Sequence, residues 1–129
     1  MVETPQSPHV LVVEDEILLN TVLCEAFREE GFAVTGVNDA DEALQLLQAC
    51  CGKVDLLVTD VRMPGELDGL ELGYFVAELW PTVPVLTVSG YTGDARRRPV
   101  GPFLAKPFAI ESLMFNANRL LALGTQWRD

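Results

Sequence analysis

The sequence is poor in basic residues and has no long apolar run. Its 129 residues include 9 Lys and Arg against 19 Asp and Glu, which gives a net charge of -10. Phosphate contacts need clustered Lys and Arg, so this balance argues against direct nucleic-acid binding. The apolar runs are shorter than a bilayer span, and the first residues lack the basic start and apolar body of a signal peptide. We therefore expect a cytoplasmic chain without a membrane segment.

Cysteine is also scarce. Cys24, Cys50 and Cys51 are odd in number and do not have the spacing of metal ligands, so we expect reduced structural thiols. The length and the apolar fraction of 49% suit one domain with a single core. We expect a flexible N-terminal tail at residues 1–8, the folded domain at residues 9–123 and a C-terminal tail at residues 124–129.

Short apolar runs alternate with segments that have helical spacing of apolar residues. Each apolar run is bounded by turn residues, which is typical of a strand buried on both faces of a parallel sheet. The pattern predicts an α/β fold, a doubly wound five-stranded parallel sheet with helices on both faces. The predicted strands lie at about residues 10–13, 32–35, 55–60, 83–88 and 102–105.

Capping signals mark the ends of the predicted helices. Gly31 ends the first helix, and Asp39 with Glu42 predicts a capping box at the second. Asp68 predicts the N-cap of the third helix, and Pro107 opens the last one. The stripe that we expect the first helix to bury comprises Leu18, Leu19, Val22, Leu23, Ala26 and Phe27.

Polar groups follow four of the predicted strands, namely Glu14-Asp15, Asp60, Ser89 and Lys106. The carboxyl ends of parallel strands share one edge of the sheet, where ligands bind. Carboxylates that converge there would repel and raise the pKa of at least one of them, unless a divalent cation neutralises them. Hard oxygen ligands suit Mg²⁺, while the Lys106 ammonium and the Ser89 hydroxyl can bind an anion. Taken singly, each group has an alternative role in a turn, a helix cap or the solvated surface.

The sequence resembles the receiver domains of two-component response regulators. The resemblance extends from about residue 10 to residue 121 and implies a flavodoxin-like sheet of order 2-1-3-4-5. A Gly-Tyr pair after Ser89 and the short stretch before Lys106 resemble a subgroup whose fourth helix is short or missing. The motifs that carry the resemblance are Val13-Glu14-Asp15-Glu16, Asp60-Val61-Arg62-Met63-Pro64 with Asp68-Gly69, Ser89-Gly90-Tyr91, and Lys106-Pro107-Phe108.

The resemblance implies a magnesium-dependent phosphoacceptor site. Asp60 corresponds to the residue that takes a phosphoryl group from a histidine kinase or a histidine phosphotransfer protein. Asp15 is the expected direct ligand of Mg²⁺, and Glu14 is expected to act through water. The backbone carbonyl of Arg62 is the further ligand. Lys106 and Mg²⁺ would then neutralise charge on the transferring phosphoryl group.

The resemblance also implies a conformational switch that a downstream protein partner would sense. Ser89 corresponds to the switch hydroxyl and Phe103 to the switch aromatic, although an aromatic residue in an edge strand is also common in a plain core. Gly93, Pro99 and Gly101 leave little room for a helix after Ser89. We therefore expect residues 91–101 to be mobile in the unphosphorylated state, with Arg96-Arg97-Arg98 as a solvated loop.

Two other functions could use a similar set of residues. A metal-dependent phosphatase can also form an aspartyl phosphate, but such enzymes resemble an Asp-x-Asp pattern, and here Arg62 stands two positions after Asp60. A docking module that works without phosphorylation would not need the complete set of acids, Ser89 and Lys106. We therefore expect a signalling domain with self-catalysed phosphotransfer and slow autodephosphorylation at most, and not an enzyme.

Overall fold

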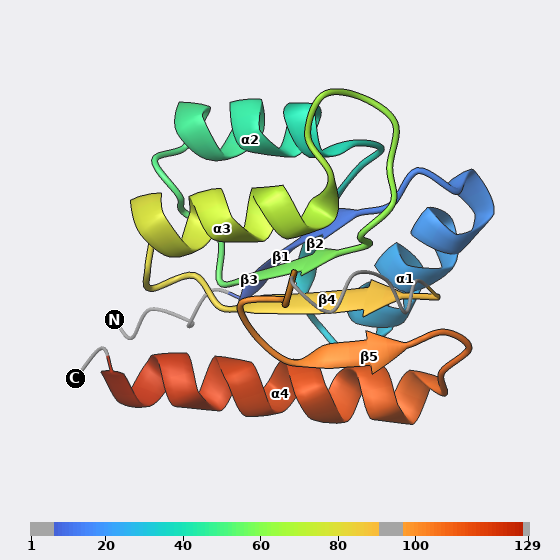
Figure 1. Ribbon diagram of the computed structural model, residues 1–129. Helices are drawn as coiled ribbons and strands as arrows, with labels where there is room; N and C mark the ends of the chain where they lie inside the picture. The colour runs from blue at the N-terminus through green and yellow to red at the C-terminus, as the bar shows by residue number, and fades with distance from the viewer. Residues whose placement is uncertain (1–6, 91–96, 128–129) are drawn as a thin grey trace.

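The computed structural model describes residues 7–90 and 97–127, with residues 123–127 described by their backbone alone. A parallel sheet of order β2-β1-β3-β4-β5 forms the middle layer (Figure 1). This result confirms the predicted fold class and strand order. The strands are β1 (His9–Val13), β2 (Ala33–Val37), β3 (Leu56–Thr59), β4 (Val85–Ser89) and β5 (Phe103–Ala105).

The three inner strands are the most apolar part of the chain. Every residue of β3 and β4 is buried, and so is every residue of β1 after His9. The edge strands β2 and β5 are largely half-buried or exposed. Short runs rich in Val and Leu therefore occupy the centre of the sheet, where both faces are covered.

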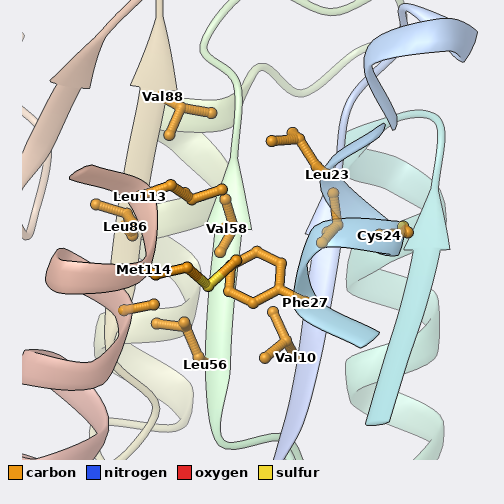
Figure 2. Close-up of a cluster of buried hydrophobic side chains, with 12 residues drawn as sticks. Val10, Leu23, Cys24, Phe27, Leu56, Val58, Leu86, Val88, Leu113 and Met114 are labelled. Atoms are coloured by element: carbon orange, nitrogen blue, oxygen red, sulfur yellow. The ribbon is translucent and has the colours of Figure 1, made fainter. Parts of the chain in front are cut away.

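Helices cover both faces of the sheet: α2 and α3 lie on one face, and α1 and α4 lie on the other (Figure 1). Phe27 of α1 packs near Met114 of α4 and against the strand residues Leu56, Val58 and Val10 (Figure 2). In the part of the chain that is described, no helix has the length and apolar character needed to cross a membrane. The helices are α1 (Ile17–Glu29), α2 (Ala40–Ala49), α3 (Gly69–Leu79) and α4 (Ile110–Trp127).

The connection from β4 to β5 contains no helix within residues 97–102. Residues 91–96, on which most of the predicted mobile segment falls, lie outside the described residues. The last helix, α4, begins at Ile110, three residues after Pro107, which the sequence predicts to open it. It continues to Trp127 and so enters the stretch that the sequence assigns to the C-terminal tail.

Asp39 and Asp68 cap α2 and α3 as predicted, whereas the capping box expected at α2 is found at α3. The Asp39 carboxylate accepts a hydrogen bond of 2.7 Å from the backbone N–H of Glu42. At α3 both halves of a capping box are present, because Asp68 accepts from the N–H of Glu71 and the Glu71 side chain accepts from the N–H of Asp68. This cap fixes the start of the helix that follows the Asp60 strand.

The predicted stripe of α1 is partly wrong. Leu23 and Phe27 are buried, but Leu18 is 79% exposed and Val22 is 50% exposed. Residues four apart share one line along a helix, and the line of Leu18 and Val22 lies beside the line that faces the sheet. Cys24 is buried in their place. The first turns of α1 therefore present apolar side chains to solvent.

Candidate functional site

The sheet register brings the predicted groups to one edge. Val13 of β1 pairs with Thr59 of β3, so Glu14 and Asp60 leave the sheet side by side. Ser89 of β4 pairs with Ala105 of β5, and the N–H of Lys106 donates to the Ser89 carbonyl. The carboxyl ends of four parallel strands therefore form a single site, as the sequence predicts.

Lys106 links two acidic residues of this site. Its ammonium lies 2.7 Å from Glu14 Oε1 and 2.8 Å from Asp60 Oδ2. Glu14 is 1% exposed and Asp60 is 7% exposed, so both carboxylates are largely shielded from water. Ion pairs in such surroundings persist when the partners are also hydrogen bonded, and both are.

Asp15 completes a cluster of oxygen ligands. One carboxylate oxygen from each of Glu14, Asp15 and Asp60 lies within 4.8 Å of the other two. Asp15 is exposed, whereas the other two are buried. Several carboxylate oxygens, one of them open to water, suit a hard cation that keeps part of its hydration shell. The donor set therefore fits Mg²⁺.

Burial and the neighbouring charges shift the pKa values of Glu14 and Lys106. Burial raises the pKa of Glu14 to about 7, and the nearby negative charge of Asp60 adds to the rise, while the hydrogen bond from Lys106 opposes it. Burial lowers the pKa of Lys106, but its hydrogen bonds to Asp60 and Glu14 outweigh burial and raise that pKa overall. Lys106 is therefore a permanent cation between the two acids.

Backbone contacts that the sequence does not predict fix Asp60. Its Oδ1 accepts a 2.6 Å hydrogen bond from the Val61 N–H, and its carbonyl accepts a 2.8 Å bond from the Thr59 hydroxyl. Gly69, the first residue of α3, donates its N–H to the Val61 carbonyl at 2.8 Å. A Cβ at Gly69 would overlap the carbonyl oxygen of Asp60. In the sequence, a glycine directly after the predicted N-cap Asp68 is the signal that could have indicated this close approach.

Asn20 fixes the loop that carries the other acids, and sequence reasoning missed it. Its side-chain amide donates to the carbonyls of Glu14 at 3.0 Å and Val37 at 2.9 Å. The Asn20 carbonyl oxygen in turn accepts from the Cys24 thiol at 3.3 Å. A polar residue next to the apolar stripe of α1 is the one signal that the sequence offers.

Of the two predicted switch residues, Ser89 lies at the site edge of the sheet and Phe103 at the start of the neighbouring strand. Ser89 ends β4 and is 2% exposed, whereas Phe103 lies in the edge strand β5 and is 42% exposed. Phe103 pairs in the sheet with Thr87, two residues before Ser89. Arg62 lies in the turn after Asp60 and has an exposed side chain.

The prediction that Arg96-Arg97-Arg98 form a solvated loop is wrong for the side chain of Arg97. The Arg97 guanidinium donates to both carboxylate oxygens of Asp68, at 2.8 and 2.6 Å. This contact raises the pKa of Arg97 above its usual range. Arg97 and Asp68, with residues 61–63, line an open cavity of about 270 Å³ beside the turn that follows Asp60. The prediction failed because nothing in the sequence places Arg97 next to a helix cap.

The sequence model of one protein family, the response regulator receiver domain, matches residues 10–118 of this chain. The chain belongs to that family. The sensor kinase CckA of Brucella abortus is 34% identical over 120 residues, which cover 89% of this chain and 13% of the kinase. A response regulator receiver protein from Sinorhizobium medicae has a TM-score of 0.84 at 26% identity, and the match covers 92% of this chain and 98% of that one.

A third relative shows the fold alone. TrrA from Thermotoga maritima, in complex with Mg²⁺-BeF, has a TM-score of 0.77 at 24% identity, covering 88% of this chain and 98% of that one. The chain spans only part of the curated relatives it matches, 13% of CckA and about a quarter of the regulator NtrC. As a receiver domain it carries an acidic pocket of Glu14, Asp15 and Asp60, the type of site at which such domains accept a phosphoryl group.

Proposed function

We propose that this receiver domain accepts a phosphoryl group on Asp60, in the cytoplasm, from a histidine kinase or a histidine phosphotransfer protein. The observation that carries the proposal is the position of Asp60 between Lys106, at 2.8 Å, and the acids Glu14 and Asp15 that follow β1. Asp60 stands at the end of a fully buried strand, and its Oδ1 is held by a backbone N–H. A carboxylate fixed in this way is ready for in-line attack.

In the proposed reaction, a carboxylate oxygen of Asp60 attacks the phosphorus atom of a phosphohistidine. A phosphorus–oxygen bond forms, the phosphorus–nitrogen bond breaks, and the histidine ring keeps the electron pair of the broken bond. Negative charge on the transferring group is stabilised by the Lys106 ammonium. Because the pKa of Lys106 is raised, this cation keeps its proton throughout.

We infer that Mg²⁺ binds to Asp15 and Asp60 directly, to Glu14 through water, and to the backbone carbonyl of Arg62. The close carboxylate oxygens support this assignment, and the TrrA relative is known in complex with Mg²⁺-BeF. When bound, the ion would neutralise phosphoryl oxygens that Lys106 does not reach. Asp15, the exposed acid of the cluster, is the residue most open to an entering cation.

We further propose that Ser89 and Phe103 form the switch. The buried Ser89 hydroxyl would move toward the new phosphoryl group, and Phe103 on the neighbouring strand would change its exposure for a downstream protein partner. The Gly90-Tyr91 pair and the absence of a helix within residues 97–102 support membership of the subgroup with a short or missing fourth helix.

The first turns of α1 are the proposed docking surface of the phosphodonor protein. Ile17, Leu18 and Val22 are 72%, 79% and 50% exposed, and they begin two residues after Asp15. A partner that delivers a phosphoryl group to Asp60 must cover this edge of the sheet. Exposed apolar side chains at that place favour a partner with an apolar surface around its phosphohistidine.

Intact-mass spectrometry tests the central proposal. The chain is incubated with Mg²⁺ and acetyl phosphate, and the expected product carries one additional phosphoryl group. Asp60→Asn should abolish this product. Asp55→Asn is the matched control, because Asp55 lies at the opposite end of the same strand and hydrogen bonds to the His9 N–H. Labelling that persists in Asp60→Asn would refute the assignment.

A further inference from the structure

Arg97 and Asp68 form a contact that the proposed reaction does not use. A single guanidinium nitrogen, Nη2, donates to both carboxylate oxygens of Asp68. The same carboxylate caps α3, because its Oδ1 accepts the Glu71 N–H at 2.9 Å. Arg97 therefore holds the residue at which α3 begins.

The start of α3 touches the backbone of Asp60. Gly69 donates to the Val61 carbonyl, and its Cα approaches the Asp60 carbonyl so closely that any side chain would clash. Packed contacts of this kind transmit small displacements because neither side has free space. A change in the position of the cap would therefore change the position of Asp60.

The residues after Arg97 also contact α3. The Tyr74 hydroxyl donates to the Arg98 carbonyl at 2.7 Å. The Val100 side chain lies 3.3 Å from the point where a Cβ would stand on Gly73. Arg97 is the contact of this series that reaches the end of α3 next to the acceptor.

We propose that Arg97 is a positioning residue for the phosphorylation of Asp60. By pairing with Asp68, Arg97 holds the first turn of α3 against the turn that follows Asp60 and keeps the Asp60 carboxylate oriented for attack. The proposal rests on the function proposed above for Asp60. Without Arg97 the capping box with Glu71 remains, so α3 stays folded while its first turn gains freedom relative to Asp60.

The rate of phosphorylation by acetyl phosphate at saturating Mg²⁺ tests this role. We expect Arg97→Gln to be roughly three- to tenfold slower than the wild type, the size of effect seen when a coupling contact is removed. Arg97→Lys should recover most of the rate, because one ammonium can donate to both oxygens as Nη2 does. Arg98→Gln is the control, since it removes the same charge from the neighbouring exposed residue and leaves the carbonyl that Tyr74 binds.

A double-mutant cycle separates this contact from a general charge effect. Asp68→Asn should slow the reaction as Arg97→Gln does, and the double variant should be no slower than the slower single variant. Rates are compared at saturating Mg²⁺ for each variant, so that a change in metal affinity does not enter the comparison. Equal rates for Arg97→Gln and the wild type, equal slowing by Arg98→Gln, or additive effects in the double variant would overturn the proposal.

The outcome for Arg97 is distinct from that for Asp60. If the wild type takes up no phosphoryl group, or if Asp60→Asn still takes it up, the proposed function fails. If Asp60 is labelled normally and Arg97→Gln reacts at the wild-type rate, only the positioning role fails. Thermal unfolding of each variant in the absence of donor checks that the fold is retained.

Discussion

The Lys106 ammonium lies 2.7 Å from the buried carboxylate of Glu14, although the two residues are 92 positions apart in the chain. Glu14 is the most buried of the acids at the site. Its pKa is still raised to about 7, because burial outweighs the hydrogen bond from Lys106. Proton binding to Glu14 is therefore coupled to the stability of the fold.

This coupling predicts a loss of stability as the pH rises. The folded chain holds the Glu14 proton more tightly than the unfolded chain, in which the carboxyl titrates near 4.5. The stabilising contribution is complete below that value and is lost as the pH rises through about 7. In a metal chelator, the free energy of unfolding should fall by on the order of 2 kcal/mol between about pH 5 and pH 8 on this account.

Urea unfolding of Glu14→Gln checks the assignment. The variant carries a permanent neutral group of the same shape, so its stability should vary less with pH than that of the wild type. Identical pH profiles for the two proteins would show that Glu14 does not titrate as described.

A second prediction concerns Gly69. Gly69→Ala places a methyl group on the Asp60 carbonyl oxygen, so we expect a loss of about 3 kcal/mol of stability and a reduced phosphorylation rate. Gly90→Ala is the matched control, because a Cβ there has its nearest neighbour, Lys106 Cβ, at 4.0 Å. Denaturant unfolding measures both variants. A stable Gly69→Ala protein would contradict the close contact.

A third prediction concerns the metal site. Asp15 is exposed, so Asp15→Asn should leave stability in the absence of metal unchanged while lowering Mg²⁺ affinity on the order of tenfold or more. Glu16→Gln removes the same charge from the next residue, also exposed, and should bind Mg²⁺ nearly as the wild type does. Calorimetric titration gives both affinities. Equal Mg²⁺ affinities for Asp15→Asn and the wild type would show that Asp15 is not a ligand of the ion.

A fourth prediction concerns the exposed face of α1. Leu18→Ser should slow transfer from a phosphorylated histidine kinase that labels the wild type, and should leave the reaction with acetyl phosphate unchanged. The reason is that the proposed docking surface places Leu18 against the partner protein, away from the reacting groups. Phe115→Ser is the control, since Phe115 is 65% exposed on α4. If both variants lose the same rate with the kinase, α1 has no special role in docking.

The arrangement of strands and the set of charged groups could be predicted because they follow from local patterns. Buried strands are continuous apolar runs, and the residue after each run enters the site. Glu14 follows Val13 at the end of β1, and Asp60 follows Thr59 at the end of β3. Side-chain caps at Asp39 and Asp68 were likewise visible, since a cap and its partner are three residues apart.

The remaining contacts depend on packing between distant segments. The predicted buried stripe of α1 included too many residues, because helical periodicity does not show which of two adjacent rows of side chains faces the sheet. Leu18, in the wrong row, is exposed. Arg97 meets Asp68 across 29 positions, and Asn20 reaches Val37 across 17. No spacing in the sequence encodes such pairs, because the backbone must fold before they approach.

Borohydride reduction of the phosphorylated chain is the most direct test of the central claim. The acyl phosphate of an aspartate is reduced to homoserine, and peptide mass spectrometry locates the change. We predict homoserine at position 60, dependent on both Mg²⁺ and phosphodonor, in the peptide that contains the end of β3. Homoserine at another acidic position, with Asp60 intact, would contradict the account.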